Sequence, residues 1–322
     1  IRVPATGVYQ LSDALIRKAG FSNPARVKIY GYGGALQPER LTFNYLMNTD
    51  DLKEVPVCEV NGRRLFHAVG PVNWSTTTTT TRTRNSYSDY GYYFLTENDG
   101  EPLRVDSATF VGAFYPSPND YHSLYEKDEY SWFHGGRNLF ESEVLTAGTP
   151  RTYTLPASST EGTLTVAMTY NAFCKATVTV NGEMLTTNIE YSDKSGKGVT
   201  EIDKYSVAAE TVWTFPVNNL GETNTIAIEK TSGGDMRVDY VAITSKEPAA
   251  SPRLSSDNFD EPEYVYHITN QNHHADTSVD MVIIIPTTQK LLAQAERLKA
   301  LHEGRDSMRV RIVPADELEK RF

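Results

Sequence analysis

The chain has 322 residues, which is enough for two or three domains of ordinary size. Its net charge is −10 and it contains no basic block, so the composition argues against nucleic acid as a partner. No apolar run approaches the roughly 18 residues that indicate a membrane-spanning helix. The 19 tyrosines, with many threonines and valines, favour a mainly β protein.

Residues 1–104 are predicted to form a β-rich N-terminal domain with one short helix. Ser12 can act as the N-cap of a helix over Asp13–Ala19, and Gly20 can end that helix in a left-handed conformation. The pattern before and after this helix is typical of short strands.

Two further features of this region concern turns and loops. The Asn61-Gly62 pair predicts a tight turn between strands over 55–60 and 64–69. The six consecutive threonines Thr76–Thr81 suit an edge strand or a mobile loop, and the sequence leaves both open.

Residues 105–250 are predicted to form an antiparallel, jelly-roll-like β-sandwich. Alternating or apolar runs recur at short spacing over residues 163–169, 176–180, 212–215, 224–228 and 236–243. Asn181-Gly182 follows the second run and predicts a two-residue hairpin turn. Several short strands separated by turn signals are the pattern of a sandwich or jelly roll.

Residues 251–322 are predicted to form a connector and then the truncated start of an α/β domain. An apolar strand over 280–286, an amphipathic helix over 290–302 and a second strand over 308–313 give a βαβ pattern. A parallel sheet needs cover on both faces, so we expect a larger α/β domain whose chemistry lies beyond Phe322.

Thiols and metal ligands give few candidate sites. Cys58 and Cys174 are predicted to be two separate buried thiols, with a single disulfide as the alternative for an exported protein. The pair His273-His274 with Asp276 has metal-ligand types, but adjacent side chains on an extended chain point apart, so a solvated connector is expected. No catalytic, cofactor or metal residue is assigned.

An acidic stretch precedes the α/β segment and raises the question of calcium. It contains Asp257, Asp260, Glu261 and Glu263. Carboxylates at this density suit calcium, which prefers oxygen ligands. The stretch lacks the regular spacing and the turn glycine of an EF-hand loop, so a solvated linker is expected and calcium is the weaker alternative.

Aromatic residues gather amid acidic ones in the second segment. They are Tyr121, Tyr125, Tyr130, Trp132 and Phe133. Exposed rings on a jelly roll would form a platform for sugar rings. Buried rings would instead serve domain packing or the core, which we favour because aromatic residues bury large areas.

The order of several phrases along the chain resembles the PorU-like sortases of the type IX secretion system, among the gingipain-like cysteine peptidases of Bacteroidota. The matching phrases are Val27–Gly34 with Pro38-Glu39, Gly70–Trp74, Tyr87–Thr96, Val279–Pro286, Ala295–Leu298 and Val310–Pro314. They span most of the chain.

The resemblance implies a modular peptidase at the outer membrane surface. In that family β-rich N-terminal domains precede a caspase-like α/β peptidase domain and further β modules. Its Cys–His dyad removes C-terminal sorting signals from exported cargo and passes the cargo to anionic lipopolysaccharide. A thiolate attacks the carbonyl carbon while the histidine manages the proton.

This chain departs from the family pattern where the catalytic residues belong. In the family they lie on later strands, and neither Cys58 nor Cys174 falls in the α/β segment. We therefore expect no peptidase activity from these residues alone. The partners that the resemblance implies are the rest of the peptidase domain, surface components of the secretion system and exported cargo.

Two other functions stay open at this stage. One is a carbohydrate-binding or adhesin-type β-sandwich surface protein without catalysis, and the other is a structural surface module. The βαβ pattern favours the peptidase fragment, because neither alternative calls for a parallel α/β segment.

Overall fold

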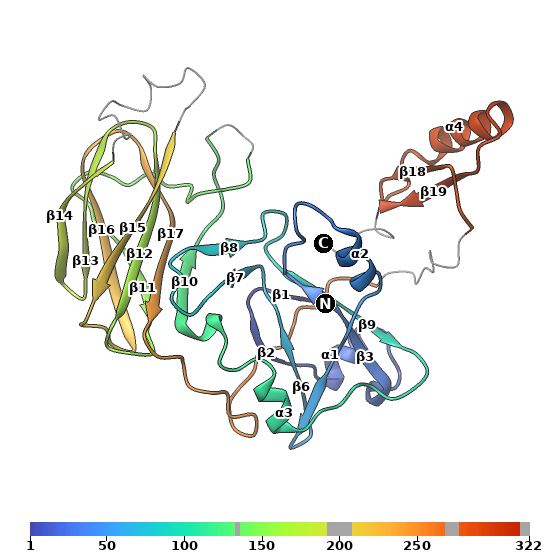
Figure 1. Ribbon diagram of the computed structural model, residues 1–322, viewed down its shortest axis with the longest axis horizontal. Coiled ribbons are helices and arrows are strands. Elements are labelled where there is room, and N and C mark those ends of the chain that lie inside the picture. Colours follow the sequence, from blue (N-terminus) through green and yellow to red (C-terminus); the bar gives the residue numbers. More distant parts are fainter. Residues whose placement is uncertain (133–135, 192–207, 268–276, 316–322) are drawn as a thin grey trace. The chain divides into compact units, whose positions relative to one another are not determined.

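The computed structural model describes residues 1–132, 136–191, 208–267 and 277–315 (Figure 1). The chain divides into two compact units. The first contains residues 1–71, 88–106 and 258–322, and the second contains residues 72–87 and 107–257. The described residues are mainly β, as the sequence predicts.

Two antiparallel sheets lie in the part of the first unit that precedes residue 107. Across the larger sheet lie β1 (Arg2–Val3), β9 (Gly91–Glu97), β3 (Val27–Gly33) and β4 (Glu54–Val55). Across the smaller sheet lie β2 (Gly7–Gln10), β6 (Arg63–Ala68) and β5 (Val57–Val60). Asn61 and Gly62 both have positive φ, 53° and 74°, which confirms the predicted turn between β5 and β6.

Short helices accompany these sheets. Helix α1 (Asp13–Lys18) begins where the Ser12 side chain accepts a hydrogen bond from the Leu15 amide, and Gly20 follows with φ of 98°, so the predicted helix is confirmed. Leu15 and Ile16 are buried in one core with Val3, Ile29 and Phe66. The other short helices of the first unit are α2 (Phe43–Asn48) and the 3₁₀ turn η1 (Pro24–Arg26).

The second unit is a β-sandwich of two antiparallel sheets within the described residues (Figure 1). One has the order β10 (His122–Glu126), β17 (Met236–Ser245), β12 (Gly162–Tyr170) and β15 (Ala209–Val217). The other has the order β11 (Arg151–Pro156), β16 (Thr223–Gly233), β13 (Cys174–Val180) and β14 (Glu183–Tyr191). Alternate residues of both sheets, such as Leu164, Val178 and Ile226, bury one shared core.

The Asn181-Gly182 pair joins β13 to β14. Both residues have positive φ, and Val180 pairs with Glu183 across the turn. The predicted hairpin is therefore confirmed. Before the sandwich strands, the chain forms α3 (Ser107–Gly112) and the 3₁₀ turn η2 (Pro118–Tyr121).

Residues 72–87, which we call the strap, lie on the outer face of the sheet that contains β10 and β17. The strap contains β7 (Val72–Trp74) and β8 (Arg82–Arg84), which pair antiparallel, and the threonine run is the loop between them. Trp74 is buried with Ala167, Tyr240 and Ala242, which face away from the sandwich core. The strap thus belongs to the second unit, although it precedes the boundary that we drew at residue 104.

The start of the connector is docked on the first unit. Arg2 and Glu263 form a backbone bridge and a side-chain ion pair, and the Gln10 amide donates to the Asp260 carbonyl. Tyr264 packs against the core of the same unit. The expectation of a solvated linker is therefore wrong for residues 260–264.

The C-terminal segment forms the predicted βαβ element. Strands β18 (Met281–Ile285) and β19 (Val310–Pro314) run parallel, and α4 (Leu292–Arg305) connects them. Ile285, Val310 and Val313 are buried. Val282 and Ile284, on one face of β18, stay 48% and 61% exposed. Among the described residues, one apolar face of this parallel pair is therefore open, whereas parallel sheets are normally covered on both faces.

Candidate functional site

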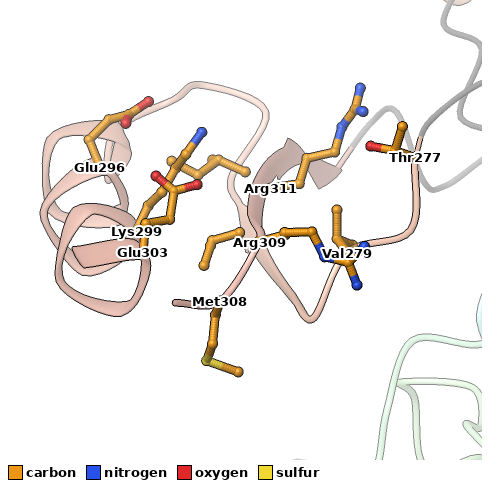
Figure 2. A pocket seen from close by; sticks show the side chains of 10 residues that line it. Thr277, Val279, Glu296, Lys299, Glu303, Met308, Arg309 and Arg311 are labelled. Carbon is orange, nitrogen blue, oxygen red and sulfur yellow. The ribbon is translucent and has the colours of Figure 1, made fainter. Parts of the chain in front are cut away.

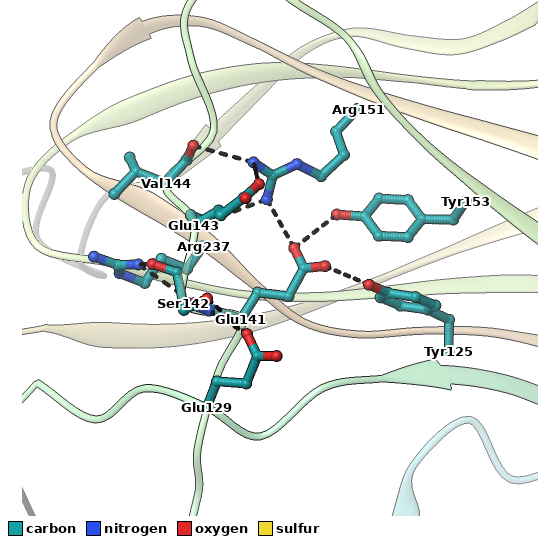
Figure 3. Close-up of polar contacts among 9 residues, drawn as sticks. All are labelled: Tyr125, Glu129, Glu141, Ser142, Glu143, Val144, Arg151, Tyr153 and Arg237. Atoms are coloured by element: carbon teal, nitrogen blue, oxygen red, sulfur yellow. Dashed lines mark hydrogen bonds and ion pairs between the residues drawn. The ribbon is translucent and has the colours of Figure 1, made fainter.

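A buried carboxylate, Glu141, lies where the two sheets of the sandwich meet. Its side chain accepts hydrogen bonds from the Tyr125 hydroxyl on β10 (2.6 Å) and the Tyr153 hydroxyl on β11 (3.0 Å) (Figure 3). The Arg151 guanidinium adds an ion pair at 2.9 Å. Burial, with the charge of Glu141, raises the pKa of both tyrosines. The two hydroxyls therefore remain donors, and the cluster ties one sheet to the other.

Two of the predicted aromatic residues pack on an arginine of the chain itself. The Arg237 guanidinium lies 3.7 Å from the ring centre of Tyr130 and 5.5 Å from that of Trp132. The two rings meet edge to face, and the Trp132 indole donates to the Thr169 hydroxyl (2.8 Å). Arg237 in turn donates to the Ser142 carbonyl (Figure 3). A cation–π contact thus already uses these ring faces.

The structure therefore does not bring the predicted aromatic residues into one platform. Tyr130 and Trp132 belong to the Arg237 stack, and Tyr125 belongs to the Glu141 cluster. Tyr121 is the half-buried last residue of η2. Phe133 lies outside the described residues. Whether any of the four described aromatic residues meets a ligand stays a prediction.

A charged cluster that the sequence analysis missed joins the strap to the sandwich. Arg82 on β8 pairs with Glu126 on β10 and with Asp239 on β17, and its guanidinium lies 4.2 Å from the centre of the Tyr240 ring. Arg84 pairs with Asp128 at 2.6 Å. The sequence held a weak signal for this cluster. Arg82 and Arg84 are two positions apart, as are Glu126 and Asp128, and residues two positions apart on an extended chain lie on the same face.

Both cysteines are buried and neither forms a disulfide, as predicted. Cys58 lies on β5 of the first unit, and Cys174 lies on β13 of the sandwich. The Cys174 thiol donates to the Gly234 carbonyl (3.3 Å), and burial raises the pKa of this thiol. A buried thiol with a raised pKa is a poor nucleophile.

The acidic stretch does not gather around one point. Glu263 binds Arg2, and Asp257 accepts from Arg253. Among the described residues, no three His, Cys, Asp or Glu side chains come together as a metal site. His273, His274 and Asp276 lie outside the described residues. The calcium alternative stays a prediction.

An open hollow of about 620 Å³ follows strand β19 in the C-terminal segment (Figure 2). The consecutive residues 308–312 line it together with Lys299 and Glu303 of α4, so it runs along an edge of the parallel pair. Nearby, Arg309 holds Asp280 through paired hydrogen bonds of 2.9 Å, which lower the pKa of Asp280. The hollow has charges of both signs and no buried nucleophile among its described lining residues.

Comparison with known proteins finds likeness in structure but not in sequence families. No protein-family model matches the chain, and no curated protein matches it in sequence. The crystal structure of dimeric latent PorU from Porphyromonas gingivalis matches 99% of the chain with a TM-score of 0.72 and 24% identity. The chain spans 37% of the length of that PorU chain.

Smaller β modules give weaker matches. A family 35 carbohydrate-binding module from Clostridium thermocellum matches 38% of the chain and 92% of its own length, with a TM-score of 0.25 and 16% identity. This second likeness is too low to carry an argument.

The PorU match shows that the chain has a PorU-like fold over nearly its whole length. Among the described residues, none of the helices combines the length and the apolar character needed to cross a membrane.

Proposed function

We propose that the chain is the non-catalytic N-terminal part of a PorU-like cell-surface cysteine peptidase, which removes C-terminal sorting signals from exported cargo. The match to PorU over 99% of the chain is the observation that carries this proposal. The order of the modules supports it: β sheets, a β-sandwich, and then a parallel βαβ element.

The chemistry of the two cysteines supports a non-catalytic role. A catalytic thiol has to reach a substrate carbonyl as a thiolate, beside a base that takes its proton. Cys58 and Cys174 are 1% and 0% exposed, and both lie on core strands. In the proposal, the nucleophile and its histidine come from a later part of the peptidase domain.

The open face of the parallel pair supports a bracing role for the β units in this proposal. Val282 and Ile284 present an apolar surface that a larger α/β domain would cover. The β units would then support the start of the catalytic domain, while the active site is built on further strands.

A cleavage assay on the extended protein tests the proposal. The reading frame is expressed past Phe322 and incubated with an exported protein that carries a C-terminal sorting domain. We expect release of that domain, and loss of release when a cysteine of the extension is changed to serine. Cys58→Ser and Cys174→Ser variants serve as matched controls and should cleave at the normal rate.

Two outcomes would contradict the proposal. One is an extended protein that folds but does not cleave the cargo. The other is cleavage that depends on Cys58 or Cys174, with the variant shown to be folded by circular dichroism.

A further inference from the structure

The strap is attached to the sandwich by an apolar end and a charged end. At the apolar end, the Trp74 ring stacks on the His122 ring, with centres 4.0 Å apart and planes 8° apart. At the charged end, Arg82 and Arg84 reach the carboxylates of β10, β17 and the residues after β10. Opening the strap would uncover the apolar patch beneath Trp74, which includes Tyr240.

The charges at the second end do not balance among the described residues. Three carboxylates, Glu126, Asp128 and Asp239, are only 6%, 7% and 7% exposed. Two guanidiniums, of Arg82 and Arg84, face them. With all groups ionised, the cluster therefore has one negative charge in excess, and burial makes such a charge costly.

Two carboxylate oxygens of this cluster lack a hydrogen-bond partner in the described part of the chain. Glu126 Oε2 and Asp128 Oδ1 are buried and have no hydrogen-bond partner among the described residues. Buried oxygens of ionised carboxylates are normally satisfied. A proton on Asp128 would remove the excess charge and supply a donor.

His122 contacts the strap at its apolar end. Its Nδ1 lies 2.6 Å from the Pro118 carbonyl oxygen, and its Nε2 lies 2.8 Å from the Thr79 carbonyl oxygen of the strap. The His122 ring thus contacts one carbonyl oxygen close to it in the chain and one carbonyl oxygen of the strap.

We propose that the strap is a proton-dependent clamp, which closes on the sandwich when Asp128 and Asp239 are protonated and loosens when these carboxyl groups lose protons. Among the described residues, the charged and titratable groups around these carboxylates include Tyr240 on β17 and Glu210 on β15, the latter through Asn138. Glu210 adds negative charge, so it favours protonation as well.

The titration of the carboxyl groups agrees in sign. Burial raises the pKa of Asp128 and Asp239 from an ordinary 3.8 to about 6, against the opposing effect of the arginines. A carboxyl group whose pKa is higher in the closed state binds more protons there. Closing is therefore favoured below pH 4, and that advantage is lost as the pH rises through about 6.

Hydrogen exchange of the full chain tests the clamp. Protection factors of strap amides, corrected for intrinsic exchange, are measured by mass spectrometry between pH 5 and pH 8. A raised pKa of about two units on a single group corresponds to at most about a hundredfold change in the opening equilibrium. We expect strap protection to fall at least tenfold over this range, while β12 stays protected.

Amide variants separate the clamp from general effects of pH. Asp128→Asn and Asp239→Asn keep an oxygen that accepts from the arginines and imitate the protonated groups. We expect both to weaken the pH dependence of strap protection at least threefold. Glu222→Gln, at an exposed position of the same unit, should behave like the parent chain.

Three results would overturn the proposal. The first is strap protection in the parent chain that does not change with pH. The second is unchanged pH dependence in both amide variants. The third is an equal loss of protection in β12, which would show unfolding of the sandwich and not opening of the strap. Protection of β12 also shows whether each variant is folded.

Discussion

Replacing Glu141 by alanine should destabilise the sandwich more than any other single carboxylate change near it. The substitution removes the acceptor of the Tyr125 and Tyr153 hydroxyls and the partner of Arg151. Tyr153 is 3% exposed, so its hydroxyl would be left in the protein interior without its acceptor.

The magnitude follows from burial. Removing one partner of a buried ion pair costs about 3–5 kcal/mol. The Arg151 side chain is 23% exposed and keeps the Glu143 carboxylate and the Val144 carbonyl as acceptors, so the lower end applies. We expect a loss of about 3 kcal/mol for Glu141→Ala and about 1 kcal/mol for Tyr125→Phe, which removes one hydrogen bond.

A matched control uses the same arginine. Glu143 also pairs with Arg151, but its side chain is 79% exposed. Exposed ion pairs contribute little, so Glu143→Gln should cost no more than about 0.5 kcal/mol.

Urea unfolding followed by hydrogen exchange in β12 and β17 measures the sandwich separately from the first unit. This separation matters because a chain with two units need not unfold in a single step. Equal losses of stability in Glu141→Ala and Glu143→Gln would refute the argument that a buried, hydrogen-bonded charge ties the sheets together.

Three further predictions concern other parts of the fold. Gly91→Ala should destabilise the first unit by at least about 2 kcal/mol, because an added Cβ would collide with the Val69 carbonyl. Thermal unfolding measures this loss, and an unchanged Tm would show that the backbone can shift to make room for the Cβ. Cys174 should react with a thiol reagent only after denaturant is added, because its thiol is buried, whereas rapid labelling of the native chain would contradict that burial. Tyr264→Ala should speed proteolysis within residues 258–267, because Tyr264 packs against the core of the first unit, and a cleavage rate equal to that of the parent would argue against docking.

Local signals predicted much of the secondary structure. The Asn-Gly pairs at 61–62 and 181–182 fix positive φ at both positions, and Ser12 caps a helix within three residues. The βαβ element also follows from short-range patterns, because the helix has a different spacing of apolar residues from the two strands that flank it. These features depend on neighbours in the chain, which the sequence displays directly.

The strap and the docked connector depend on partners far away in the chain. Arg82 meets Asp239 across 157 positions, and Arg2 meets Glu263 across 261 positions. Alternation shows that Arg82 and Arg84 share a face, but not which sheet that face covers. For the same reason, the sequence suggests one aromatic cluster between residues 121 and 132, although Tyr125 lies at Glu141 and Tyr130 and Trp132 lie at Arg237.

The bridge between Arg2 and Glu263 has a consequence for the order of synthesis. Residues 107–257 are an insertion in the first unit, because that unit contains residues on both sides of them and Glu263 pairs with Arg2. During translation, the whole sandwich is synthesised before Glu263, which pairs with Arg2 in the first unit. The inserted module can therefore finish folding first, and the N-terminal sheets must wait for a contact of very high sequence separation.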